Sequence, residues 1–185
     1  MPKLTYISLF SGAGVGCHGF TQEGFSCVVS NELIQRRLDV QRFNNKCKYD
    51  SGYLTGDITT PEIQNAILEQ LKLWHTKEKI NDIDVLIATP PCQGMSVANH
   101  KKTKDEIKRN SLVTESIRQV VQIRPRIFVF ENVAAFLKTP CTDIDGLVRP
   151  IGEAIERNLS DKYSIYAKVI NFKDYGVPSS RTRTL

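Results

Sequence analysis

The chain has 185 residues, of which 41% are hydrophobic and 24% charged, and its formal net charge is +5 at pH 7. This length predicts one compact domain, 1–185, and the composition excludes collagen-like, disordered and coiled-coil proteins. No apolar run approaches the roughly 20 residues of a membrane span. Met1–Leu4 carries one positive charge, unlike a secretory signal.

Strand-like and helical patterns alternate along the chain. Strands are expected at residues 4–10, 26–30, 53–55, 83–88, 126–130 and 163–171, and helices at 17–24, up to Asn44, from Pro61 to about His75, 110–123 and 144–159. Such alternation predicts an α/β fold with a mostly parallel sheet and helices on both faces. Ligands of such folds bind where the strands end.

Glycines and acids follow three of the expected strands. Phe10–Gly16 forms a glycine-rich turn that lets a ligand approach the backbone, although such a turn can also serve packing alone. Glu32 could bind a ribose diol or be a surface residue at a helix start, and Asp57 could bind an adenine amino group or be a turn residue. Together they suggest an adenosine-containing ligand.

A cysteine follows the most apolar expected strand, behind two rigid prolines. Of the five cysteines, only Cys92 stands at the ligand edge, and no short spacing predicts a metal site. The other four are expected to be buried thiols of a reduced, cytoplasmic chain. The segment Lys101–Arg109, which follows Cys92, is rich in positive charge; it is either a solvated face or a phosphate-binding loop.

Two further groups of charged residues stand late in the sequence. Glu131 comes directly after an apolar strand, where a carboxylate is costly unless it is paired or used. Arg181 and Arg183 are two apart on an expected strand and should face the same side, which could also be an ordinary solvated face.

In this order, these motifs resemble the DNA (cytosine-5) methyltransferase family. The matching segments are Phe10–Gly14, Asn31–Glu32, Gly56–Ile58, Pro91–Gln93, Arg109–Leu112, Glu131–Val133 and Asp174–Pro178, followed by Arg181 and Arg183. The resemblance covers almost the whole chain, and Pro-Cys-Gln followed at this separation by Glu-Asn-Val is highly specific. It implies a Rossmann-like S-adenosylmethionine-dependent methyltransferase fold.

The resemblance also implies a cofactor and a set of residues that bind it. The methyl donor would be S-adenosyl-L-methionine, with contacts from Phe10, Ser11, Gly12, Gly14, Glu32, Leu33, Asp57, Ile58, Pro90 and Leu112. Glu32 would hold the ribose, and Asp57 with Ile58 would face the adenine. Leu33 stands where an aromatic residue often stacks on that adenine.

The implied reaction is methyl transfer to C5 of a cytosine flipped out of double-stranded DNA. Cys92 would add to C6, Glu131 would bind or protonate N3, Arg183 would hold the base oxygen and Arg181 would support the site. The carbonyl of Pro90 would accept a hydrogen bond from the exocyclic amine. DNA contacts would come from Gln93, Ser96, Lys101, Lys102, Lys104 and Arg109.

The family pattern continues beyond Leu185 into a target-recognition region and a closing helix. The fold of residues 1–185 is therefore expected to be incomplete at its C-terminal end, with the rest supplied by a longer chain or a second subunit. Alone, the chain should be weakly active or inactive.

Other functions were weighed against this one. The same chemistry on tRNA remains open, and an idle binding module is disfavoured because Cys92, Glu131 and Arg183 are intact. A nicotinamide oxidoreductase is disfavoured because the turn lacks the third glycine of the dinucleotide motif. A bacterial modification enzyme, cytoplasmic or nucleoid-associated, is the main expectation.

Overall fold

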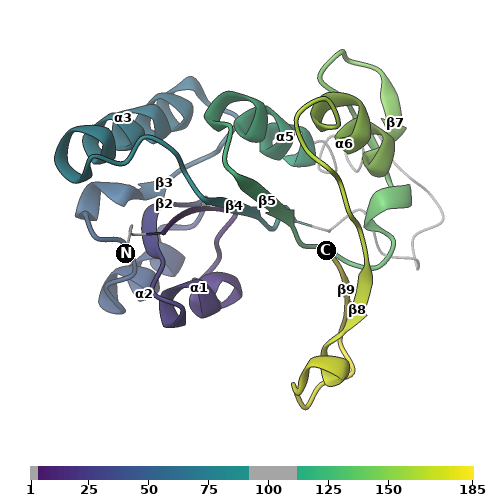
Figure 1. Cartoon of the computed structure of the whole chain (residues 1–185), viewed down its shortest axis with the longest axis horizontal. Coiled ribbons are helices and arrows are strands. Elements are labelled where there is room, and N and C mark those ends of the chain that lie inside the picture. Colours follow the sequence, from purple (N-terminus) through teal and green to yellow (C-terminus); the bar gives the residue numbers. More distant parts are fainter. Residues whose placement is uncertain (1–3, 92–111) are drawn as a thin grey trace. The chain divides into compact units, whose positions relative to one another are not determined.

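The computed structural model describes residues 4–91 and 112–185 (Figure 1). The chain divides into two compact units. The first comprises Met1–Thr89 and Ile123–Val129, and the second Pro90–Gln122 and Phe130–Leu185. No helix in the described ranges is both long and apolar enough to cross a membrane.

The first unit is built on a five-stranded sheet in the order β3-β2-β1-β4-β5. Its strands are β1 (Thr5–Leu9), β2 (Ser26–Glu32), β3 (Tyr53–Thr55), β4 (Val85–Ala88) and β5 (Ile127–Phe130). The pairs β1–β2, β1–β4 and β2–β3 are parallel, so these strands end at one edge. This confirms the predicted Rossmann-like architecture.

Helices cover both faces of this sheet. The 3-10 turn η1 (Val15–Cys17), α1 (His18–Gln22) and α2 (Gln35–Phe43) lie on one face, and α3 (Pro61–Glu78) on the other (Figure 1). A short turn, η2 (Asp50–Gly52), leads into β3. The start of α3 follows the expected capping pattern, because Thr60 Oγ1 accepts from Ile63 N and Pro61 takes the first helical position.

One hydrophobic cluster of the first unit lies on the α1–α2 side of the sheet, and α3 buries Ile63, Ile67 and Trp74 on the other side. The cluster contains Tyr6, Cys17, Cys27, Leu38, Cys47, Tyr53, Val85 and Ile87. Cys17, Cys27, Cys47 and Cys141 are all buried free thiols, as the sequence predicted. By contrast, β5 is the edge strand of the described sheet, and Ile127 at its start is 56% exposed.

The second unit combines helices with two small antiparallel hairpins. Its elements are α5 (Leu112–Ile123), η3 (Phe136–Lys138), β6 (Pro140–Thr142), β7 (Val148–Pro150), α6 (Ile151–Leu159), β8 (Val169–Asn171), η4 (Phe172–Tyr175) and β9 (Thr182–Thr184). The pairs are β6–β7 and β8–β9. α5 buries Val113, Ile117 and Val120 on one face.

The expected helix at residues 144–159 is wrong in its first half. A turn at Asp143–Gly146 and the strand β7 precede α6, which begins only at Ile151. Gly146 has φ 83°, which favours glycine, and Pro150 cannot donate within a helix. The expected strand at 163–171 is likewise only Val169–Asn171.

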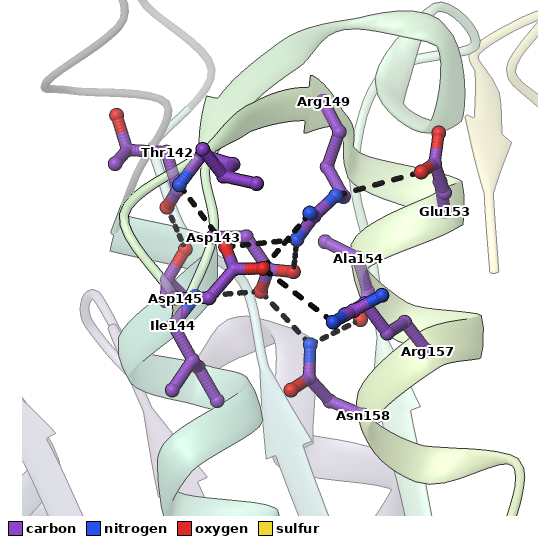
Figure 2. Close-up of polar contacts among 11 residues, drawn as sticks. Thr142, Asp143, Ile144, Asp145, Arg149, Glu153, Ala154, Arg157 and Asn158 are labelled. Carbon is purple, nitrogen blue, oxygen red and sulfur yellow. Dashed lines mark hydrogen bonds and ion pairs between the residues drawn. The ribbon is translucent and has the colours of Figure 1, made fainter.

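A network of ion pairs and hydrogen bonds connects the β6–β7 hairpin to α6 (Figure 2). Arg149 pairs with Asp143, with Asp145 at 2.9 Å and with Glu153 at 3.5 Å. Asn158 Nδ2 donates to Asp143 Oδ1 at 2.8 Å. The side chains of Arg149 and Asp143 are 9% and 1% exposed, and their mutual pairing offsets the cost of burying them.

Candidate active site

The glycine turn that follows β1 contains three residues with left-handed backbone conformations. Phe10 has φ 54°, Gly12 φ 56° and Gly14 φ 86°. A positive φ is uncommon for phenylalanine, and here Thr89 Oγ1 donates to the carbonyl of Phe10 at 2.9 Å and so helps to hold it. Among residues 4–91 and 112–185, no atom lies within 4 Å of the place where a Cβ on Gly12 would stand, so these residues leave the turn open there.

Glu32, at the end of β2, is buried and binds this turn. Its Oε2 accepts from the backbone N–H of Gly12 at 2.9 Å, and its Oε1 accepts from Ile34 N at 3.2 Å and Arg37 Nη1 at 3.0 Å. Glu32 is 5% exposed and is therefore not the surface residue that was the alternative interpretation. These contacts bring Glu32 and the glycine turn together, and their shared role in binding a ligand stays a prediction.

The third strand end is joined to the second by Asn31. Its Nδ2 donates to the carbonyls of Leu54 at 3.0 Å and Gly56 at 3.1 Å. Asp57, which follows, is exposed, and its Oδ1 accepts from Thr59 N at 2.9 Å. Its other carboxylate oxygen accepts no hydrogen bond from the described part of the chain, which suits an acceptor for a ligand's amino group.

The two apolar residues assigned to the cofactor have opposite environments. Leu33 is 66% exposed, whereas Ile58 is only 2% exposed. Leu33 can therefore offer an apolar surface to a ligand, but Ile58 belongs mainly to the core.

Sequence reasoning missed a glutamine beneath the turn. Gln41 of α2 is 1% exposed, and its Nε2 donates to Ser11 Oγ at 2.9 Å and to the carbonyl of Gly12 at 2.7 Å. Lys46 Nζ donates to the carbonyl of Gly14 at 2.7 Å. A signal was available, because Gln41 is three residues after the buried Leu38 and so shares its helix face.

These features fit an adenosine-containing cofactor. The open space above Gly12 leaves room for a ligand against the backbone, and the Glu32 carboxylate can accept hydrogen bonds from a ribose diol. The exposed Asp57 and Leu33 supply a polar acceptor and an apolar surface. The predicted residues at the ends of β1, β2 and β3 therefore offer the groups that a nucleoside would need, and their role in binding one stays a prediction.

In the second unit, Glu131 and Arg183 form an ion pair. Arg183 Nε lies 3.0 Å from Glu131 Oε1, and the two side chains are 14% and 28% exposed. Both residues were predicted to act in one site, and the structure places their side chains in contact. Arg181 differs, because it precedes β9 and is exposed, so the expectation that both arginines lie on one strand is wrong.

Asn132 holds this region together. Its Nδ2 donates to the carbonyl of Pro90 at 2.9 Å, and its Oδ1 accepts from Val133 N at 2.9 Å. Its backbone exchanges two hydrogen bonds with Thr184, of 3.0 and 2.8 Å. Pro90, the segment with Glu131 and the strand with Arg183 thus meet at a single asparagine. Sequence reasoning quoted this residue but gave it no role.

Some predicted residues cannot be placed. Cys92, Gln93, Ser96, Lys101, Lys102, Lys104 and Arg109 lie outside the described residues. Leu112 is the first residue of α5, in the second unit, and is partly exposed.

Comparison with known proteins identifies the class to which this fold and these residues belong. The family model for C-5 cytosine-specific DNA methylases matches residues 4–185. The chain belongs to this family.

Curated relatives agree with this assignment. The chain is 33% identical over 182 residues to the type II methyltransferase M1.HgaI of Avibacterium volantium, and 38% identical over 183 residues to M1.HphI of Haemophilus parahaemolyticus. It covers 48% and 44% of these two proteins, so it spans about half their length. It covers 68% of M.AquIA of Picosynechococcus sp., at 33% identity.

A solved structure shares the fold. A crystal structure from E. coli, described as a prophage-encoded DNA modification methyltransferase, aligns with a TM-score of 0.68 at 24% identity, covering 98% of this chain and 45% of that one. This similarity supports the methyltransferase fold.

Proposed function

We propose that this chain is the catalytic part of an enzyme that transfers a methyl group from S-adenosylmethionine to C5 of cytosine in DNA. The single observation that carries the proposal is the Glu131–Arg183 ion pair of 3.0 Å, beside an asparagine that also holds Pro90. Pro90 precedes Cys92 by two positions. An acid, a base-binding arginine and a nucleophile are the groups that this reaction needs.

The cofactor would be held by the first unit. The Glu32 carboxylate would accept from the ribose hydroxyls, Asp57 would accept from the adenine amino group, and Leu33 would cover an apolar face of the adenine. The floor of this cofactor site would consist of Phe10, Ser11, Gly12 and Gly14. When bound, S-adenosylmethionine supplies an electrophilic methyl group.

The chain's own groups would make the cytosine reactive. The Cys92 thiolate adds to C6, and the electron pair displaced from the C5–C6 double bond makes C5 a nucleophile as Glu131 gives a proton to N3. Arg183 holds the base oxygen, and the carbonyl of Pro90 accepts from the exocyclic amine. After methylation, the C5 proton would pass to solvent, and the electron pair of the C5–H bond would re-form the C5–C6 double bond as the C6–S bond breaks and the thiolate leaves. The N3 proton would return to Glu131, which restores the ring.

The substrate is proposed to be double-stranded DNA with the target base flipped out of the helix. The positive residues Lys101, Lys102, Lys104 and Arg109 would contact phosphates, and Gln93 and Ser96 would contact DNA beside the flipped base. A role in a modification system is part of the proposal and is supported by the names of the relatives, which are type II methyltransferases.

A trapping experiment tests this function. The whole protein in which this chain occurs is incubated with S-adenosylmethionine and duplexes of randomised sequence that carry 5-fluorocytosine. Because fluorine replaces the C5 proton, the ring cannot be restored and a covalent adduct should accumulate. The expected adduct maps to Cys92 and is absent in Cys92→Ser.

Two other outcomes would contradict the proposal. Trapping on a 5-fluorocytosine tRNA but not on DNA would reassign the substrate to RNA. Binding of S-adenosylmethionine without any adduct on either nucleic acid would favour an idle binding module.

A further inference from the structure

The inference concerns Gln41, a residue that lies under the glycine turn and has no part in the proposed chemistry. A glutamine side chain in the interior costs free energy unless its polar atoms are paired. At 1% exposure, Gln41 has partners for both its amide nitrogen and its amide oxygen, and all of them belong to the turn or to β2.

Three side chains close a ring of hydrogen bonds. Gln41 Nε2 lies 2.9 Å from Ser11 Oγ, Ser11 Oγ lies 2.8 Å from Ser30 Oγ, and Ser30 Oγ lies 2.6 Å from Gln41 Oε1. Each hydroxyl has one proton. If Gln41 donates to Ser11, Ser11 to Ser30 and Ser30 to Gln41, every group is satisfied once. A closed ring of this kind is cooperative and fixes all its members.

The second amide proton of Gln41 fixes the backbone of the turn. Gln41 Nε2 donates to the carbonyl of Gly12 at 2.7 Å, while the N–H of the same Gly12 donates to Glu32 Oε2 at 2.9 Å. Both polar atoms of Gly12 are therefore engaged. Gln41 is thus connected through the backbone of Gly12 to the Glu32 carboxylate, which would bind the ribose.

Gln41 also defines the shape of the turn by contact. A Cβ on Gly14 would stand 2.9 Å from Gln41 Cγ, closer than real Cβ contacts. The turn packs directly against the Gln41 side chain, so a substitution at position 41 is expected to change the conformation of the turn.

We propose that Gln41 is a positioning residue, which holds the turn and Glu32 in the arrangement that binds S-adenosylmethionine. This inference rests on the proposed function, because it names a residue that supports the same cofactor site. Gln41 is buried and acts through Ser11 and Gly12 without touching the ligand.

The test measures binding of S-adenosylmethionine by calorimetry, without DNA, to the whole protein and its variants. Gln41→Met keeps the length of the side chain but removes all of its side-chain hydrogen bonds. The Kd of this variant for S-adenosylmethionine should rise roughly 10- to 100-fold. The matched control is Gln70→Met. Gln70 is 7% exposed on α3 and accepts from Ser51 Oγ at 3.2 Å, away from the turn. Its Kd should stay within about twofold of the wild-type value.

A second variant separates positioning from loss of folding. Gln41→Glu cannot donate to Gly12 when ionised, but the protonated acid can donate one hydrogen bond. Its Kd, relative to wild type, should therefore be raised at pH 8 and recover towards pH 6. Because a buried, ionised carboxylate would also destabilise the fold, the folded fraction is measured by circular dichroism on the same samples. A Kd ratio that recovers in acid while the folded fraction stays constant supports positioning, and a ratio that only follows the folded fraction overturns it.

The outcomes are distinct. If wild type binds and Gln41→Met binds equally well, or if Gln70→Met weakens binding as much, the inference is overturned while the proposed function stands. If wild type itself fails to bind S-adenosylmethionine, the proposed function fails. Should Gln41→Met not fold, Ser30→Ala, which opens only the ring, must raise the Kd at least threefold or the inference is overturned.

Discussion

Arg183 Nε lies 3.0 Å from Glu131 Oε1, which joins the strand β9 to the residue directly after β5. Both side chains keep some contact with solvent, and ion pairs in such positions add little to stability. We therefore expect the pair to matter more for the orientation of its two groups than for the stability of the unit.

Replacement of Arg183 should separate activity from stability. In Arg183→Ala, kcat/KM for DNA methylation should fall about 10²- to 10³-fold, because a donor to the base oxygen is lost. The melting temperature should change little. Arg181→Ala is the matched comparison, since Arg181 is exposed before β9, and it should lose less than about tenfold. Transfer of labelled methyl groups measures both, and equal losses would refute the distinction.

Asn132 should matter through its side-chain amide. Asn132→Asp keeps the acceptor for Val133 N but replaces the donor to Pro90 with an oxygen, which repels that carbonyl. The free energy of unfolding in urea should fall by about 1–3 kcal/mol, and methylation should fall with it. A variant as stable and active as wild type would show that the Pro90 contact is dispensable.

The two neighbouring glycines of the turn should respond differently to alanine. Gly14 has φ 86° and packs on Gln41, whereas a Cβ on Gly16 meets nothing within 4 Å. Gly14→Ala should weaken binding of S-adenosylmethionine by roughly tenfold or more, since strain and overlap add. Gly16→Ala should bind within about twofold of wild type. Fluorescence or calorimetric titration tests both, and the reverse order would be inconsistent with the turn described above.

The charge network of Figure 2 predicts a pH dependence of stability. The hydrogen bond from Arg149 is the main reason that the pKa of Asp145 lies below its usual value of 3.8. A lowered folded-state pKa stabilises the fold above the unfolded pKa, and this contribution is lost as pH falls through the folded pKa.

Asp145→Asn should therefore be less stable than wild type at pH 7, and the two proteins should converge as pH falls below about 4. Urea unfolding at pH 7, 4 and 3 measures the difference. Asp161→Asn, an exposed position after α6, is the control and should follow wild type throughout. A constant gap between Asp145→Asn and wild type would exclude the linkage.

The positive segment after Cys92 should account for part of the salt dependence of DNA binding. If Lys101, Lys102 and Lys104 each contact a phosphate, their replacement by alanine should reduce the slope of log K against log salt by about 2.7. Lys72→Ala with Lys77→Ala removes two charges from α3 and should leave the slope unchanged. Fluorescence anisotropy over a salt series gives the slopes.

Much of the fold could be predicted from the sequence because its strands are short apolar runs with clear ends. Val85–Ala88 before Pro90 and the capped start of α3 at Thr60 are examples. The helix expected from Ile144 failed because the local turn at Gly146 and the proline at 150 override an apolar period. That error arose from turn chemistry and not from the period itself.

The candidate site could be predicted as far as its motifs, but not the contacts between them. Glu32 and Glu131 were found because charge at a strand end is unusual. Gln41 was missed because its role depends on how α2 packs against the turn. Its position three residues after Leu38 indicates that it shares a helix face with that residue, but not which groups it contacts. The ion pair between Arg37 and Glu32 was missed for the same reason.

The hydrogen bond from the N–H of Gly12 to Glu32 also affects how nucleotides can bind at the edge of the sheet where β1 and β2 end. In dinucleotide-binding folds, free N–H groups of the glycine turn receive a pyrophosphate. Here that amide already donates to the Glu32 carboxylate, so an incoming diphosphate would meet a negative charge where it needs a donor. A nucleotide phosphate would therefore have to take its hydrogen bonds from groups other than the Gly12 amide, whereas the uncharged ribose of S-adenosylmethionine needs only acceptors such as the Glu32 carboxylate.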